Sequence, residues 1–137
     1  MDVYKSIFTS KLSRKIPKVK AILDKYMIST DAFLIDWMYT IYSKSFSVNV
    51  TRVIWDIYFL FGDYYFIRTA YSIFACLKKD LQKGNNLEDG FRFIRSKAAE
   101  IKLSNIVQHT LREVKTIPQI HQIIQKHKDV LDKVGKK

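Results

Sequence analysis

Apolar residues recur at the spacing of an amphipathic helix along nearly the whole chain, and this periodicity limits the fold more than any other feature. The 137 residues include only 4 glycines and 2 prolines, so turn signals are scarce, and no segment has the pattern of a strand. Hydrophobic residues make up 47% of the sequence, which excludes a disordered chain and supplies a core for one domain. The sequence therefore predicts an all-α bundle of about seven helices, folded as a single domain over residues 1–137.

Local signals indicate where the first helices break. An apolar stripe with lysines on its opposite side runs over residues 8–26, and Pro17 interrupts it because proline lacks a backbone donor. We therefore expect a break or kink near residues 15–16. A further helix, reaching to about residue 42, is expected to begin at Ser29 or Thr30, because both are favourable N-cap residues.

The segment from about Val48 to Phe61 is apolar almost all round. An amphipathic surface helix keeps a polar face, so this pattern predicts a helix that is central and buried. Gly62 is placed to end it in a left-handed conformation, and Asp63 to cap a helix that continues to about residue 83. Four aromatic residues of this part of the chain are expected to be mostly buried: Trp37, Trp55, Phe59 and Phe74.

The C-terminal helices are expected over residues 86–134. Asn86 followed by Asp89 resembles a capped helix start, and Ser104 is expected to cap the helix after it. Pro118 falls in the first turn of the last helix. A backbone N–H at that position would have no intrahelical partner, so proline, which lacks one, is well tolerated there.

The sequence holds no arrangement of residues typical of a catalytic or metal site. Its glycines are isolated, so there is no phosphate-binding loop. His109, His121 and His127 lack the spacing of metal ligands and are expected on the polar faces of the last two helices, whereas Cys76 is expected in the core. We therefore predict no catalytic residue, no metal and no cofactor. The single cysteine is typical of a reducing, intracellular setting.

The formal net charge is +11, and basic residues concentrate near the start of the chain. The basic segment, residues 5–25, contains seven Lys or Arg residues and one acid, Asp24. Such a run is typical of a solvated helix face, although its field also favours an acidic protein surface or an anionic membrane. Nucleic acid is disfavoured as a partner, because the aromatic rings that could stack on bases lie in later, apolar helices. The most apolar window, residues 53–61, is short and contains Asp56, so we expect no membrane span, and we see no signal peptide.

Four short motifs lie between Trp37 and Ala70. They are Trp-Met-Tyr-Thr-Ile-Tyr-Ser from residue 37, Ile-Trp-Asp at 54–56, Phe-Gly at 61–62 and Ile-Arg-Thr-Ala at 67–70. Their order and spacing resemble the later half of the TBC domain family, the Rab GTPase-activating proteins, with the match covering about residues 3–82. The chain departs from the family pattern at three positions, where Ser47 replaces a proline, Val53 an arginine and Phe61 an acidic residue.

The resemblance implies that four residues support the family's structure or face its GTPase: Arg52, Trp55, Asp56 and Arg68. A carboxylate inside an apolar helix needs a charged or hydrogen-bonded partner, so we expect Asp56 to contact an arginine. Arg52 lies one turn earlier, and Arg68 lies on the following helix. The interaction is either an internal salt bridge that braces two helices or part of a groove that faces the GTPase.

Catalysis in this family, by the same resemblance, uses an arginine and a glutamine delivered in trans to the GTPase nucleotide. These belong to Ile-x-x-Asp-x-x-Arg and Tyr-x-Gln motifs that precede the Ile-Trp-Asp signature, and neither occurs in this chain. Residues 89–92 copy the Asp-x-x-Arg core, but Asn86 stands in place of the Ile and the order is reversed.

The resemblance therefore implies an all-α C-terminal TBC subdomain from an activator of Rab-family GTPases in vesicle trafficking. Such a chain would be inactive alone, cytoplasmic, and peripheral on endomembranes through the basic segment. It would also tend to self-associate through the surface that normally meets the missing half. The alternative is a non-catalytic helical interaction module with a basic surface.

Overall fold

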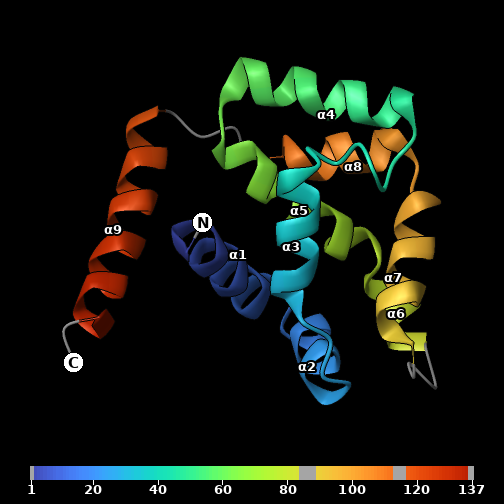
Figure 1. Cartoon of the computed structure of the whole chain (residues 1–137), viewed down its shortest axis with the longest axis horizontal. Coiled ribbons are helices and arrows are strands. Elements are labelled where there is room, and N and C mark those ends of the chain that lie inside the picture. Colours follow the sequence, from blue (N-terminus) through green and yellow to red (C-terminus); the bar gives the residue numbers. More distant parts are fainter. Residues whose placement is uncertain (1, 84–88, 113–116, 136–137) are drawn as a thin grey trace.

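The computed structural model describes residues 2–83, 89–112 and 117–135, and every regular element within these ranges is an α-helix. The helices are α1 Asp2–Lys15, α2 Pro17–Lys25, α3 Thr30–Tyr39, α4 Val48–Phe61, α5 Tyr64–Cys76, α6 Lys78–Lys83, α7 Gly90–Ala99, α8 Leu103–Thr110 and α9 Ile117–Gly135 (Figure 1). The all-α prediction is confirmed. The described helices outnumber the expected seven because two stretches are each divided in two. The stripe over residues 8–26 breaks at Ile16 between α1 and α2, and the helix expected over residues 63–83 is divided at Leu77 into α5 and α6.

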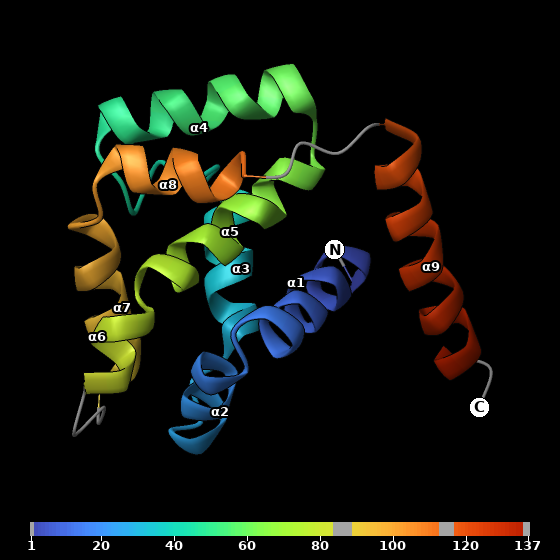
Figure 2. The same ribbon diagram turned by 180° about the vertical axis from the view of Figure 1, so that it is seen from behind.

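The bundle is organised around α5. Every residue of this helix from Tyr64 to Phe74 is buried except Tyr71, and α5 packs against α1, α3, α4, α6 and α8. In Figures 1 and 2, α4 and α8 lie on one side of α5, α1 and α2 lie on the other, and α9 stands at the edge of the molecule. Aromatic side chains from three helices meet at the centre, and their ring centroids lie 5.4–5.8 Å apart: Phe8, Phe33, Trp37 and Phe74. Burial of Trp37 and Phe74 was predicted and is confirmed.

The prediction that the helix over residues 48–61 is central was wrong. Only one side of α4 is buried, through Thr51, Ile54 and Ile57, and its main helical neighbour is α5. Trp55 and Phe59, expected in the core, are 37% and 74% exposed. The helix lies across the outside of the bundle (Figure 1), so its second apolar face has no covering element among the described residues. A helix that is apolar all round indicates a second contact surface, and this contact need not lie within the same chain.

Helix boundaries follow the local signals in most places. The chain breaks at Ile16 and resumes with Pro17 in the first turn of α2. The Ser29 Oγ accepts a hydrogen bond from the Ala32 N–H at 3.4 Å, which caps α3 as expected. Gly62 ends α4 with φ of 94°, a left-handed value that favours glycine. Pro118 lies in the first turn of α9.

Other boundaries differ from the expectation. Helix α3 ends at Tyr39, short of residue 42, because the chain turns through positive φ values at Ile41 and Tyr42. Asp63 makes no capping hydrogen bond and instead accepts one from the Tyr4 hydroxyl, 3.3 Å away. Helix α8 begins at Leu103, so Ser104 lies inside it and caps nothing. The proposed cap at Asn86 lies outside the described residues.

Candidate functional site

The outer side of α4 carries three of the four residues singled out by the resemblance. Helical spacing places Val48, Arg52, Trp55 and Phe59 in one stripe along the helix axis, with Asp56 beside it. All five are exposed, and Val48 is exposed by 84%. The surface therefore combines apolar side chains with one cation and one carboxylate.

The predicted contact of Asp56 with an arginine was wrong. Asp56 is exposed and forms no hydrogen bond or ion pair with the described residues, and the same holds for Arg52. The carboxylate avoids desolvation because it faces water, so it needs no buried partner. The two residues stand one turn apart on the surface, and both charges are available to a partner.

Trp55 has a structural role despite its exposure. Its indole Nε1 donates a hydrogen bond to the carbonyl of Ile41 at 2.7 Å. Ile41 and the adjacent Tyr42 have φ values of 50° and 62°, which are unfavourable for residues other than glycine. The Tyr42 hydroxyl donates to the carbonyl of Phe66, so two aromatic side chains hold this turn against α4 and α5. This local strain gives no signal in the sequence, because no glycine marks it.

Arg68 lies apart from the α4 surface and contributes nothing to it. Its side chain is only 3% exposed, and its Nε donates to the Thr110 carbonyl of α8 at 2.9 Å. The Thr110 hydroxyl donates to Ser72 Oγ at 3.0 Å, and Ser72 in turn donates to the carbonyl of Arg68 at 2.7 Å. This network joins α5 to α8. The expected approach of Arg68 to Asp56 does not occur.

The remaining candidate residues behave as structural or surface groups. Asp89 accepts a hydrogen bond from the Arg92 N–H at 3.3 Å, so the Asp-Gly-Phe-Arg segment is a helix cap, and its Arg92 is exposed. Cys76 is only partly buried at the end of α5, and burial raises the pKa of its thiol. Within residues 2–83, 89–112 and 117–135 we find neither a cluster of three metal-ligating side chains nor a helix long and apolar enough to cross a bilayer.

Similarity to known proteins covers the first part of the chain. A model of the Rab-GTPase-TBC domain family matches residues 1–82, which contain α1 to α5 and nearly all of α6. The chain is 32% identical over 83 residues to TBC1 domain family member 14 of Homo sapiens, an alignment that covers 61% of this chain and 12% of that protein. It is 39% identical over 54 residues to Drainin of Dictyostelium discoideum, covering 39% of this chain and 12% of that protein.

A further relative is TBC1 domain family member 12 of Xenopus tropicalis, which is 31% identical over 70 residues, with 51% of this chain and 10% of that protein covered. The chain thus spans only 10–12% of the length of these relatives. No solved structure matches it. The helical fold and the match over more than half of the sequence define the class, and the chain belongs to the Rab-GTPase-TBC domain family.

Proposed function

We propose that this chain is the C-terminal half of a TBC domain whose parent protein activates GTP hydrolysis by Rab-family GTPases in vesicle trafficking. The observation that carries the proposal is the family match over residues 1–82, which contains the Ile-Trp-Asp signature and its following Gly. The chain supplies helical scaffold and contact surface to that activity. It does not supply the chemistry.

The lack of chemistry is proposed from the sequence. Activation of phosphoryl transfer needs a cation and a water-orienting group held at the nucleotide, and the arginine alone contributes roughly 10³–10⁵ in rate. Neither family finger motif occurs in the 137 residues. The copied Asp-x-x-Arg segment supports this proposal, because its Asp89 is already engaged as a helix cap. An exposed arginine that is not held in position contributes little to catalysis.

The outer side of α4 is our candidate for the surface that meets the GTPase. Its apolar residues are exposed by up to 84%, and Arg52 and Asp56 beside them lack partners among the described residues. Protein interfaces have this composition, with an apolar or aromatic centre flanked by charges that set orientation. The signature residue Trp55 then acts in two ways, as a contact and as the anchor of the turn at Ile41.

The test is binding of the chain to a panel of Rab GTPases loaded with a non-hydrolysable GTP analogue, measured by biolayer interferometry. Phe59→Ser on α4 should weaken binding about tenfold or more, because interface aromatics dominate affinity. Val134→Ser is the matched control. Val134 is 67% exposed and belongs to the C-terminal end of α9, which lies away from α4 in Figures 1 and 2. Equal effects of the two substitutions, or no binding to any Rab, would reject α4 as the GTPase-facing surface.

A second candidate function follows from the same surface and from the charge. A non-catalytic interaction module would use exposed apolar residues on α4 for a protein partner or for a second copy of the chain. Cations of the basic segment on α1 and α2 would associate with an anionic endomembrane, which would make the protein cytoplasmic and membrane-peripheral. Some of this charge is paired, as in Lys5 with Asp31 at 3.7 Å and Lys20 with Asp24. The parent sequence before residue 1 distinguishes the two functions, because only an activator carries the finger motifs there.

A further inference from the structure

A small cavity between α1, α5 and α8 collects positive charge. Its volume is about 130 Å³, and its lining contains five basic residues and a tyrosine: Lys11, Lys15, Arg68, Tyr71, His109 and Arg112. Among the described residues no carboxylate lines it. Lys15 and Arg112 are exposed, whereas Arg68 forms the buried base. Like charges brought together in this way repel, so the arrangement favours an anion.

Arg68 provides a second and independent indication. The guanidinium is buried, and its Nε donates a hydrogen bond to the Thr110 carbonyl at 2.9 Å. Its Nη1 is buried and has no hydrogen-bond partner in the part of the chain that the structure describes. A buried charged donor without a partner is costly, and natural structures rarely retain one unless a ligand or ion completes it.

The neighbouring side chains show the same positive field. The pKa of His109 is lowered by its burial and by the charge of Arg112. Lys11 stands 4.8 Å from the centre of the Tyr71 ring, so this ammonium is held over the cavity wall by a cation–π contact. A bound anion would offset the repulsion that His109 experiences.

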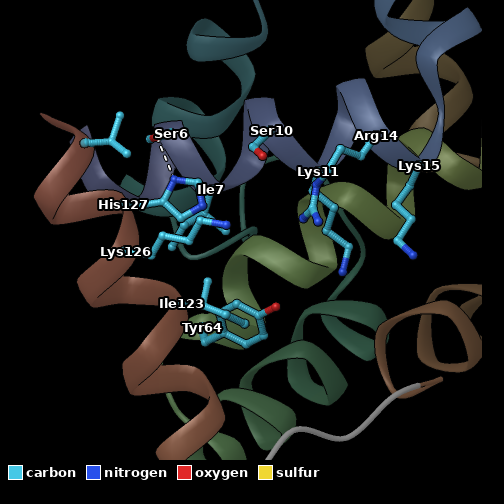
Figure 3. Close-up of a pocket in the computed structure, with 11 residues that line it drawn as sticks. Ser6, Ile7, Ser10, Lys11, Arg14, Lys15, Tyr64, Ile123, Lys126 and His127 are labelled. Carbon is cyan, nitrogen blue, oxygen red and sulfur yellow. Dashed lines mark hydrogen bonds between the residues drawn. The ribbon is translucent and has the colours of Figure 1, made fainter. Parts of the chain in front are cut away.

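The size of the cavity limits the ligand. Sites for whole small molecules are usually about 300–1,000 Å³, so this cavity suits a single ionic group and not a complete nucleotide. It shares Lys11 and Lys15 with a larger cavity of about 600 Å³ between α1, α5 and α9. Figure 3 shows Lys11, Arg14 and Lys15 along α1, with Tyr64 opposite them. A phosphate in the small cavity can thus carry a polar body that extends into the larger one.

We propose that Arg68, Lys15, Arg112 and their neighbours form a binding site for a phosphomonoester group. Arginine and lysine donors converge on one point, and arginine can donate two parallel hydrogen bonds to phosphate oxygens. Arg68 and Arg112 lie outside the basic segment, so this site is distinct from a general attraction of that segment to membranes. The phosphomonoester is carried either by a soluble ester or by a lipid headgroup.

Isothermal titration calorimetry of the full chain with inositol 1,4,5-trisphosphate tests the soluble source. Flotation with vesicles containing phosphatidylinositol 4,5-bisphosphate, against phosphatidylserine vesicles of equal charge, tests the lipid source. The site predicts saturable binding that weakens about tenfold in Lys15→Gln and in Arg112→Gln, as expected for loss of one hydrogen bond to a charged group. Lys18→Gln is the matched control, because Lys18 is exposed, belongs to the basic segment and lines neither cavity.

Preference for the soluble or the vesicle probe identifies which molecule carries the phosphomonoester. Binding to either probe supports the site if Lys15→Gln and Arg112→Gln weaken it more than the control Lys18→Gln does. The NMR titration of His109 gives a second readout, since an occupied site raises the His109 pKa and a diffuse surface layer does not. The proposal is overturned if neither probe binds. It is also overturned if Lys18→Gln weakens binding as much as Lys15→Gln, or if bound ligand leaves the His109 pKa unchanged.

Discussion

The two faces of α4 should respond very differently to truncation. Ile54 is 2% exposed and packs into the core, so Ile54→Ala should cost about 3 kcal/mol, within the usual range of about 2–5 kcal/mol for such changes. Phe59 is 74% exposed, so only about a quarter of its surface is buried in the fold, and truncation loses only that contribution. Phe59→Ala should then cost roughly 0.5 kcal/mol, partly offset by the better helix propensity of alanine.

These losses in the free energy of unfolding convert to measurable shifts in Tm. An unfolding entropy of about 2.1 cal/mol/K per residue gives roughly 290 cal/mol/K for 137 residues. Ile54→Ala should therefore lower Tm by about 10 °C and Phe59→Ala by at most about 2 °C. Thermal and urea unfolding followed by far-ultraviolet circular dichroism measure both. If Phe59→Ala destabilises the isolated chain as much as Ile54→Ala, the outer face of α4 is covered in solution and our description of it is wrong.

Three further predictions concern single contacts. Gly62→Ala should lower the free energy of unfolding by about 1–3 kcal/mol, because φ of 94° with ψ of −179° strains any residue other than glycine. The added Cβ meets no atom within 4 Å, so the cost is backbone strain and not a clash. An unchanged midpoint of urea unfolding would contradict this. Trp55→Phe should cost about 1 kcal/mol through loss of the hydrogen bond to Ile41, and a neutral effect would show that the turn does not need it. The pKa of His127, which shares a 2.8 Å hydrogen bond with Ser6, is lowered from 6.5 by burial, Lys126 and Arg14. On acidification, His127 therefore takes up its proton at a higher pH in the unfolded chain than in the folded one. The free energy of unfolding should fall as pH drops through 6.5, and it should fall less in His127→Gln.

Much of the fold could be predicted because its signals are local. Pro17 ends one hydrogen-bond ladder, Ser29 caps the next helix, and Gly62 accepts a backbone angle that other residues resist. Each signal acts within a few residues, so the sequence alone reveals it. The division between α5 and α6 carries no such marker and was missed.

The site could be predicted only in part, because burial depends on what packs against a helix. The composition of α4 shows that both faces are apolar, but it does not show which face the bundle covers. For the same reason Asp56 was expected to be buried and paired, when it is exposed. Arg68 was recognised from its motif, yet its burial against α8 depends on a residue 42 positions later in the chain. Ser72 lies one turn after Arg68 and donates to its carbonyl, and a serine within this apolar helix is a local sign that this side of α5 has a polar contact.

The central proposal is that this chain is the non-catalytic half of a Rab activator. Single-turnover phosphate release, measured across a panel of GTP-loaded Rab proteins, tests it most directly when the 137-residue chain is compared with a longer native chain that carries both finger motifs. We predict that the short chain leaves hydrolysis near the intrinsic rate, whereas the longer chain accelerates it by roughly 10³–10⁵-fold for its target. Strong acceleration by the short chain would show that a catalytic arginine lies within these residues, and no acceleration by the longer chain would favour the interaction module instead.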